Sequence, residues 1–542
     1  MEIKIILLFF VCFEFKFIVC SSCGTNQLKI TPSYIDIGDI QRRKLSYEYS
    51  PINIKVDMTY LKSQNILNDE QFKNLEETIE EVTGYFKKIL SVQKINFINS
   101  DFPQYIKNNC GIPNFDLGDK NFDLLIIPKI SSDLNKNQLA AGAPCVYLIN
   151  HKPVAGIVIL NNNLSWEKNN FKYNMKTLLL HEFSHVLAFH QNFFKNLNMT
   201  STRNINGQQY YFINSPKVIE KARIHFGCDS IKGVQLENDG GDGTAGSHWD
   251  SRFMLGDYMM ASDYQDVVLS DISLALFEDT GFYQVNYYTG GLFRFGKNQG
   301  CSFIEKKCLY DQGKKIMFPN DFCNESGKSF CSSSHISRGN CLIINNSSIS
   351  KEYRYFGDKR TGGFSHADYC PVSFSTNSNN YYFPNNCRYG KNENEDEIIS
   401  EDSLCFESSI KNSGMKSVCY KMVCNPTSKT FSIYIGSKIV NCPGNETVLS
   451  NPSGFNGQIK CPDYNLVCTS QVWCNDIFDC IEQKSEADLS TYDYLYNKLE
   501  LQKRDSAKLE IDDSILILED KSSIISLNLN LIILLFVLLI NF

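Results

Sequence analysis

The spacing of hydrophobic and polar residues predicts both strands and helices in the first part of the chain. Residues 52–61 (INIKVDMTYL) alternate apolar and polar positions, the pattern of a half-buried strand. Residues 67–92 instead repeat apolar side chains at intervals of three and four, the pattern of an amphipathic helix. Short β-branched runs at 122–130 and 154–160, each bounded by turn residues, predict two further strands. We therefore expect an α+β fold.

A second long helix is predicted from Asn174 onward, with Asn174 or Thr177 as its N-cap. It contains the sequence TLLLHEFSHVLAFHQNFF, which holds three of the chain's eight histidines. From Cys301 onward the pattern changes, because cysteine, glycine, asparagine and serine become frequent and long periodic segments disappear. That composition is typical of a loop-rich domain held together by disulfides.

Composition and charge narrow the class of protein. The chain has 542 residues, 43% of them hydrophobic, which is enough for about two to four domains with cores of their own. Its formal charge is −7, and acidic and basic residues are interspersed along the sequence. A basic stripe that could neutralise nucleic-acid phosphates is therefore missing from the sequence, and we exclude nucleic acid as a partner.

The N-terminal sequence is typical of an exported protein. Residues 1–22 place a lysine before an apolar stretch and small residues at its end, as a secretory signal peptide does. An N-terminal membrane anchor is the alternative, which we disfavour because the uninterrupted apolar run is too short to span a bilayer. Residues 23–44 end in the basic cluster Arg42, Arg43 and Lys44, where processing enzymes could cut, and predict a propeptide.

Cysteine usage supports the same route. Of the 21 cysteines, 18 lie between Cys110 and Cys480, an even number that allows disulfide pairing throughout. Potential N-glycosylation sequons agree with export to the cell surface or beyond. They start at Asn163, Asn198, Asn324, Asn345, Asn346 and Asn445.

The C-terminal end predicts an anchor. Residues 486–523 are charged and predict a stalk, whereas 524–542 form an apolar tail. A short terminal apolar tail behind a polar spacer is typical of a glycolipid-anchor signal, and a membrane-anchoring tail helix is the alternative. The candidate attachment residues are Ser506, Ala507, Ser514, Ser522 and Ser523.

The pentapeptide HEFSH supplies the first candidate chemistry. Residues four apart lie on one face of an α-helix, so His181 and His185 can direct two imidazole nitrogens at one cation. Glu182 lies about 100° round the helix, where it can reach a water bound to the same metal. Zinc would acidify that water and polarise a scissile carbonyl, while the carboxylate accepts the proton. The alternative is an amphipathic helix whose histidines face solvent.

A catalytic zinc takes three protein ligands, so the pattern requires a third. His190 would point away from His185 if the helix continued, and His225 and Cys228 are also in range. The better candidate is His248, because the preceding sequence NDGGDGTAGS lets the chain turn sharply and approach a metal closely.

Taken together, these motifs resemble the leishmanolysins, surface metalloproteases of the metzincin group. Metzincins pair a helical HExxH with a later histidine and a methionine turn, and leishmanolysins separate the second and third ligands by a long insertion. GSHWDSR, DYMMAS and SLALFEDTGFYQVNY resemble the family's third-ligand region, methionine turn and following helix. GKNQGCSF, FCSSSHISRGNC and GGFSHADYCP resemble its cysteine-rich half. The resemblance covers most of residues 45–480.

The resemblance implies a metzincin-like zincin domain that uses Zn²⁺ to cleave protein or peptide substrates, and it assigns a role to each motif residue. The implied zinc ligands are His181, His185 and His248, the general base is Glu182, and the methionine beneath the metal is Met260, with Met259 as its nearest competitor. The segment AAGAPCVYLINHKPVAGIVIL resembles the strand region that lines the cleft and can pair with substrate backbone.

Two positions, Ala188 and Cys23, depart from the family pattern, and Gln191 differs only from the compact metzincins. Ala188 replaces a glycine that ends the helix in a left-handed turn, so we expect a reshaped turn there. Gln191 occupies the position at which compact metzincins carry the third histidine. Cys23 is the candidate for the family's zinc-holding propeptide cysteine, although SSCGTN lacks the usual histidine and aspartate.

These expectations divide the chain into six regions. They are a signal peptide at 1–22, a propeptide at 23–44, a catalytic region with its insertion at 45–300, a cysteine-rich domain at 301–485, a stalk at 486–523 and a tail at 524–542. The predicted function is zinc-dependent endopeptidase activity at the cell surface or outside the cell. The alternative is an inactive surface adhesion or coat protein on the same scaffold, which we disfavour because all four motif residues of the site are present. The sequence does not define the oligomeric state.

Overall fold

The computed structural model describes residue 30, residues 32–35 and most of the chain from 49 to 468. Within that stretch it leaves out 95–101, 114, 117–120, 136–137, 165–170, 206–207, 239–243, 263, 265–266, 288–292, 346–348, 358–359, 375–384, 389, 391, 393–394 and 401. The predicted signal peptide, basic cluster, stalk and apolar tail lie outside the described residues, as does Cys23.

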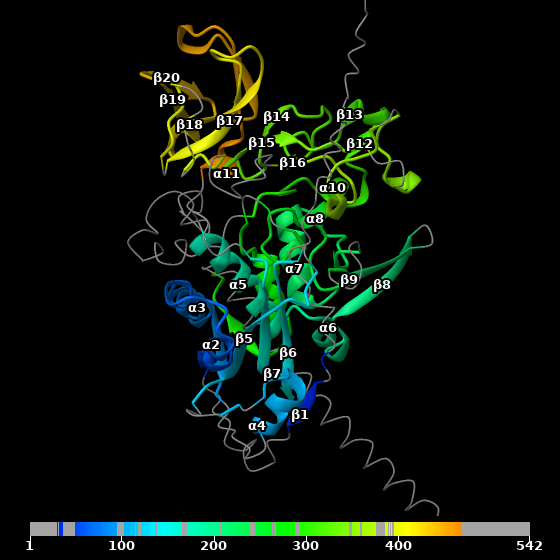
Figure 1. Cartoon of the computed structure of the whole chain (residues 1–542). Coiled ribbons are helices and arrows are strands. Elements are labelled where there is room, and N and C mark those ends of the chain that lie inside the picture. The colour runs from blue at the N-terminus through cyan, green and yellow to red at the C-terminus, as the bar shows by residue number, and fades with distance from the viewer. Residues whose placement is uncertain are drawn as a thin grey trace, which may run out of the picture.

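A five-stranded sheet forms the centre of the N-terminal half (Figure 1). Its strands, in spatial order, are β1 (Ser33–Ile35), β6 (Ala140–Leu148), β7 (Pro153–Asn161), β5 (Leu124–Ser131) and β3 (Ile54–Val56). Strands β3, β5 and β7 run parallel, and β6 pairs antiparallel with β7. β1 comes from the predicted propeptide and pairs parallel with the end of β6. The predicted strands at 122–130 and 154–160 are confirmed.

Two long helices, α3 (Asp69–Ile89) and α5 (Phe171–Leu187), pack in the same core. α3 begins with a capping box in which Asn68 and Gln71 satisfy each other's backbone N–H groups. Its apolar face packs on α5, where the rings of Phe86 and Phe183 stack at 6.2 Å. The helix predicted at 67–92 is thus confirmed, except that its last residues enter strand β4 (Leu90–Gln93).

Helix α5 approaches the sheet so closely that two strand positions require glycine. A Cβ added at Gly142 on β6 would lie 2.1 Å from the carbonyl oxygen of Glu182. A Cβ at Gly156 on β7 would lie 2.3 Å from the side chain of Val186. Because real Cβ atoms do not approach other heavy atoms at such distances, these glycines fix the depth at which α5 sits on the sheet.

Two predicted boundaries are wrong. The strand predicted at 52–61 is confined to Ile54–Val56, and the following helix α2 spans Thr59–Ser63, since Asp57 accepts a hydrogen bond from the backbone N–H of Thr59 and starts a turn. Helix α5 begins at Phe171, so neither Asn174 nor Thr177 is its N-cap. In the first case the apolar pattern identified the strand but missed where it ends, and in the second it identified the helix but missed where it starts.

The segment between α5 and His248 forms a small α/β insertion. Its elements are α6 (Gln191–Asn196), β8 (Thr200–Ile205), β9 (Gln208–Ile213), α7 (Pro216–Phe226) and β10 (Val234–Gln235). Strands β8 and β9 make an antiparallel hairpin that extends to one side of the molecule (Figure 1). After the insertion come α8 (Ser251–Met254), α9 (Asp271–Asp279) and β11 (Tyr283–Val285), which with β4 and β2 (Tyr49–Pro51) completes a three-stranded sheet.

The C-terminal part contains more regular structure than its composition indicates. A six-stranded antiparallel sheet comprises β17 (Ser403–Ser408), β18 (Lys416–Asn425), β19 (Thr430–Ile435), β20 (Lys438–Cys442), β21 (Thr447–Ser450) and β22 (Gln458–Cys461). This sheet has its own core, built around Phe406 and Ile433, and lies at the opposite end of the molecule from β1 (Figure 1). The prediction of a loop-rich domain is therefore wrong for this sheet, whose strands include the ten-residue β18.

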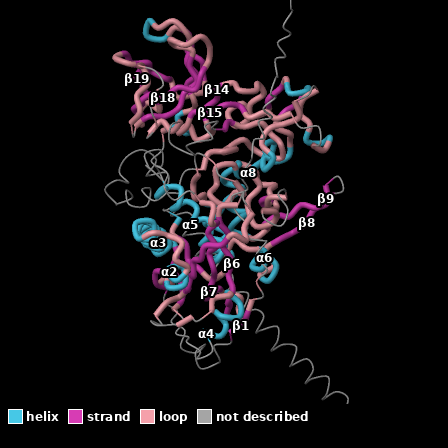
Figure 2. The backbone as a smooth tube through the Cα atoms, in the orientation of Figure 1, coloured by secondary structure: helices cyan, strands magenta, loops and turns pink. Residues whose placement is uncertain are grey.

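Irregular backbone does dominate the segment between β11 and this sheet (Figure 2). Its elements are α10 (Cys301–Glu305), β12 (Leu309–Tyr310), β13 (Lys315–Ile316), β14 (Ser329–Cys331), β15 (Arg338–Cys341), β16 (Ser373–Phe374) and the 3₁₀ turn η7 (Ser365–Ala367). Phe303 and Phe364 from this segment are buried in the same core as Phe183 of α5. The cysteine-rich half is therefore packed directly on the half that carries the HEFSH motif.

Sixteen cysteines of the described residues form eight disulfides, which confirms the prediction of a disulfide-rich chain. The pairs are Cys110–Cys145, Cys228–Cys301, Cys308–Cys370, Cys323–Cys341, Cys331–Cys405, Cys387–Cys419, Cys424–Cys468 and Cys442–Cys461. Among the described residues, we find no helix with the length and apolar character needed to cross a membrane.

Candidate metal centre

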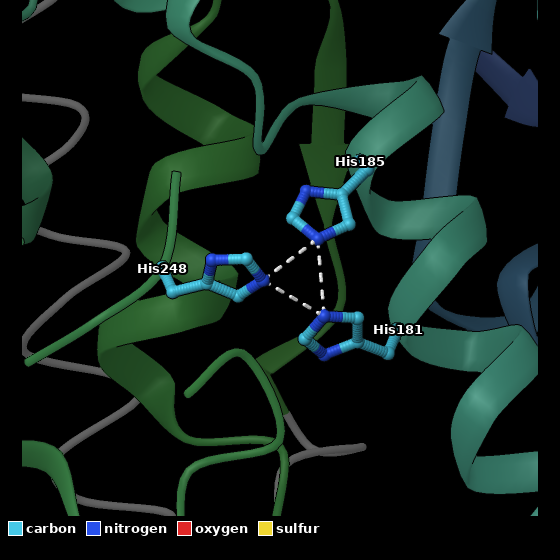
Figure 3. Close-up of side chains that lie close together, drawn as sticks. All are labelled: His181, His185 and His248. Carbon is cyan, nitrogen blue, oxygen red and sulfur yellow. Dashed lines mark hydrogen bonds between the residues drawn. The ribbon is translucent and has the colours of Figure 1, made fainter. Parts of the chain in front are cut away.

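Three histidines from two distant segments meet in one buried cluster (Figure 3). His181 and His185 project from successive turns of α5, and His248 projects from the loop that follows the insertion. The Nε2 atoms of His181 and His185 are 3.0 Å apart, and each lies 3.1 Å from Nε2 of His248. The structure therefore brings together the three histidines that the sequence analysis singled out.

The other nitrogen of each ring is held by a backbone carbonyl. Nδ1 of His181 donates to Tyr258 O at 2.7 Å, Nδ1 of His185 to Phe189 O at 2.5 Å, and Nδ1 of His248 to Thr244 O at 2.9 Å. A carbonyl oxygen can only accept, so each Nδ1 carries the proton and each neutral ring presents an Nε2 lone pair to the centre. Three facing lone pairs cannot hydrogen-bond to one another, and a shared cation satisfies all three.

Burial keeps the imidazoles in this neutral state. His185 and His248 are fully buried and His181 is 6% exposed. Burial lowers the pKa of His181 to about 4, an effect that the bond to Tyr258 only partly offsets. Burial also lowers the pKa of His185 and of His248 well below the ordinary value, and the neighbouring histidines add to the effect. All three side chains are thus in their metal-binding form at neutral pH.

The donor set fits zinc. Nitrogens that bind one ion tetrahedrally at about 2.0–2.1 Å lie about 3.3 Å apart, close to the separations observed here. Within the described part of the chain this is the one group of three or more His, Cys, Asp or Glu side chains placed to hold a metal. Three histidines without cysteine are the ligand set of zinc sites that keep a position open for chemistry, and carbonyl partners on Nδ1 are the usual support for such ligands.

The alternative third ligands are engaged elsewhere. His190 lies at the start of α6, where its Nδ1 accepts a hydrogen bond from the backbone N–H of Asn192. His225 donates through Nε2 to Phe295 O, and Cys228 forms a disulfide with Cys301. His190 was expected to point away along a continuous helix, but α5 ends at Leu187 and the chain turns before α6 begins.

The turn after α5 does not place Ala188 in a left-handed conformation. Ala188 is not among the described residues with a positive φ, so it lacks the conformation for which glycine is suited. Instead the N–H groups of Ala188 and Phe189 both bond to Ser184 O, each at 2.8 Å. The turn leaves the carbonyl of Phe189 directed at His185, and the substitution is therefore compatible with the site.

The loop of His248 is fixed by contacts that the sequence did not reveal. The backbone N–H of Glu237 donates to His248 O at 2.9 Å, and the carbonyl of Glu237 accepts from Gly246 at 2.8 Å. The side-chain amide of Gln191 donates to Ala245 O at 2.8 Å. Every residue has a backbone carbonyl and every residue except proline has a backbone N–H, so no sequence signal distinguishes the ones that support a ligand.

Glu182 and the two candidate methionines are all buried. Glu182 is fully buried on α5, next to His181. Met259 and Met260 are buried in the segment that bridges to Trp249, where Met259 O accepts from the Trp249 N–H at 3.0 Å. The same turn includes Tyr258, whose carbonyl holds His181 and whose hydroxyl lies 2.8 Å from Ser184 Oγ.

A buried carboxylate accepts hydrogen bonds from the methionine-containing turn and from the serines packed against it. Asp257 accepts hydrogen bonds from the hydroxyls of Ser270 and Ser273 and from the backbone N–H of Met259. Burial raises the pKa of Asp257 to about 6, and these bonds lower it in part. Ser273 also accepts from the Trp249 indole at 2.7 Å, so one network joins the turn to the residue that follows His248.

The mixed helix-and-sheet fold, the disulfides and the buried three-histidine cluster agree with the zinc metalloprotease class that the motifs resemble. The sequence model of one such family, leishmanolysin, matches residues 21–474. The chain belongs to the leishmanolysin family, and the resemblance identified from the motifs is confirmed.

Individual relatives agree with this assignment. The leishmanolysin homolog of Crithidia fasciculata is 30% identical over 361 residues, covering 62% of this chain and 53% of the relative. Leishmanolysin of Leishmania major is 28% identical over 318 residues, covering 54% and 51%. A leishmanolysin-like peptidase of Caenorhabditis briggsae is 35% identical over 222 residues, covering 36% and 34%. The chain thus spans about half the length of the first two of these relatives.

Proposed function

We propose that this chain is a zinc-dependent endopeptidase of the metzincin type. The observation that carries the proposal is the convergence of three Nε2 atoms within 3.1 Å while every Nδ1 donates to a carbonyl. In this proposal His181, His185 and His248 hold the ion, and Met260 is the methionine of the turn beneath it. Membership of a zinc metalloprotease family supports the same assignment.

Glu182 is the proposed general base. Zinc held by the three histidines would supply the Lewis acidity that polarises a scissile carbonyl and acidifies a water. Glu182 would accept the proton of the attacking water and deliver it to the leaving amine. The adjacent position on α5 allows this, because the carboxylate shares the helix with two ligands without being one of them. Its burial strengthens the electrostatic interaction with the reacting atoms.

Proteins or peptides are the proposed substrates. Strand β6 pairs antiparallel with β7 along one edge. Along its other edge, among the described strands, β1 pairs only with Val146, Tyr147 and Leu148. We infer that the remaining part of this strand pairs with an extended substrate backbone, as the resemblance implies. In this mode the enzyme binds the main chain of the substrate and depends little on its side chains, which suits an enzyme that cleaves within proteins.

The proposed location is the cell surface or the extracellular space. Eight disulfides support passage through an oxidising compartment. Sequon asparagines 163, 198, 345 and 445 are exposed, and an exposed side chain is what glycosylation requires. We propose that the N-terminal signal directs export and that the apolar tail provides the anchor.

The proposal is tested on the secreted, processed protein. Zinc content is measured by mass spectrometry, and proteolysis is measured on a casein-type substrate with and without a chelator. We expect one zinc per chain and cleavage that chelation abolishes. A folded protein that binds zinc but does not cleave any protein substrate would instead support the non-catalytic surface protein.

A further inference from the structure

A histidine of the cysteine-rich half reaches the loop that carries His248. Nδ1 of His366 lies 3.0 Å from Oε2 of Glu237, and the two side chains are only 6% and 1% exposed. His366 belongs to the 3₁₀ turn η7, in the motif GGFSHADYC. Neither residue is one of the three histidines that face the metal centre.

Glu237 is bound to the ligand loop through its backbone on both sides. Its N–H donates to His248 O at 2.9 Å and its carbonyl accepts from Gly246 at 2.8 Å. The preceding residue Leu236 pairs with Trp249 in an antiparallel bridge. Because these bonds flank His248, a movement of Glu237 would move the imidazole with it.

The turn that presents His366 is itself fixed. Cys370 closes the segment through its disulfide with Cys308, and the backbone N–H of Cys370 donates to Ala367 O at 2.9 Å. The ring of Phe364 packs against His366 at 5.6 Å and against Phe374 of β16 at 5.3 Å. The imidazole therefore meets Glu237 from a rigid support.

We propose that His366 is a positioning residue for the third zinc ligand, acting through the side chain of Glu237. The proposal rests on the proposed zinc function of the same site. The cysteine-rich half would then do more than cover the catalytic half, since one of its side chains holds the ligand loop at the distance the metal requires. His181 and His185 are preorganised by a single helix, whereas His248 needs support from other segments.

The test compares His366→Ala with His366→Asn in the full-length processed protein. Asparagine places an N–H donor close to the position of Nδ1 and should keep the contact with Glu237. Zinc affinity is measured by competition with a chromophoric chelator, and the visible spectrum of the Co²⁺-substituted protein reports the geometry of the ligands. We expect His366→Ala to weaken zinc binding about 10–100-fold and to shift the cobalt bands. His366→Asn should restore most of both properties.

Kinetics and a matched control separate positioning from a general loss of structure. With zinc in excess, His366→Ala should lower kcat and leave KM nearly unchanged. His335 is the control, because it lies in the same half and binds Cys405 O, near the six-stranded sheet. His335→Ala should leave zinc affinity and the cobalt spectrum as they are in the unchanged protein.

A double-variant cycle tests whether the effect passes through Glu237. In a Glu237→Ala background, which keeps the backbone bonds, His366→Ala should cause no further loss of zinc affinity. If His366→Ala fails to fold, the Glu237→Ala and His366→Asn variants still decide, since the first should weaken zinc binding and the second should not. If the wild-type protein binds zinc and a folded His366→Ala variant binds it equally well, the role of His366 is overturned while the proposed function stands. Wild-type protein that binds no zinc overturns the proposed function.

Discussion

The side-chain amide of Gln191 donates a hydrogen bond to the carbonyl of Ala245 at 2.8 Å. In compact metzincins, position 191 would carry the third histidine itself. Here the residue at that position holds the loop of a histidine that arrives after a long insertion. The contact is close enough that a Cβ at Gly246 would lie 2.8 Å from the Gln191 nitrogen, and Gly246 has a φ of +79° that favours glycine.

We therefore expect Gln191→Ala to weaken zinc binding modestly. The hydrogen bond is exposed, and one such bond contributes about 1 kcal/mol, which corresponds to about a fivefold loss of affinity. Chelator competition measures the change. Lys195→Ala, on the same short helix and also exposed, is the control and should have no effect. Equal zinc affinity for the Gln191 and Lys195 variants would show that this contact does not support the site.

Glu182→Gln should separate metal binding from catalysis. Glutamine has nearly the same size and cannot accept the proton, so the variant should fold and hold zinc while kcat/KM falls by about 10²–10⁴-fold or more. Zinc content and cleavage of a denatured protein substrate are measured together. An unchanged rate with one zinc per chain would remove Glu182 as the base.

Gly142→Ala tests the close packing of α5 on β6. The added Cβ would lie 2.1 Å from Glu182 O, so the helix must shift or the strand must bend. We expect a loss of about 1–3 kcal/mol in the free energy of unfolding and a loss of activity, because the same helix carries two ligands. Gly84→Ala is the matched control, since nothing lies within 4 Å of the new Cβ and alanine should stabilise α3 by up to about 1 kcal/mol. Denaturant unfolding would contradict the packing argument if both substitutions had the same effect.

The pH dependence of zinc binding follows from the buried imidazoles. Protons compete with the ion for the Nε2 lone pairs, and burial lowers the pKa of His181 to about 4 and those of His185 and His248 well below the ordinary value. The neutral rings should therefore keep zinc affinity nearly constant from about pH 8 to about pH 6, with loss only as the pH falls toward 4. Chelator competition at each pH measures this. A loss centred near the ordinary histidine pKa of about 6.5 would contradict it.

The sequence predicted the elements better than their ends. The apolar periodicity of residues 67–92 identified α3, since a long amphipathic stripe has few alternative structures. The alternation at 52–61 did not distinguish a strand from the three-residue β3 followed by α2, because so short a run fits both periods. The six-stranded C-terminal sheet was missed although β19 alternates buried and less buried positions, because the frequent Cys, Gly, Asn and Ser of this region favoured a prediction of loops.

Some residues of the candidate site could be predicted from the sequence, and others could not. His181, Glu182 and His185 share one helix and are readable from local spacing, whereas His248 required the glycine-rich segment and the family resemblance. The contacts that fix these residues were not predictable, because they come from backbone atoms such as the carbonyl of Tyr258. His366 lies in GGFSHADYCP, one of the motifs that resemble the family, yet only the three-dimensional arrangement brings it to Glu237.

The proposed function requires that three imidazoles bind one zinc ion. Zinc K-edge X-ray absorption is measured on the secreted, processed protein and on its His248→Ala variant. We expect one zinc per chain with three imidazole nitrogens at about 2.0–2.1 Å, and loss of that signal in the variant. Sulfur ligands, or a zinc environment that is the same with and without His248, would contradict the proposed function.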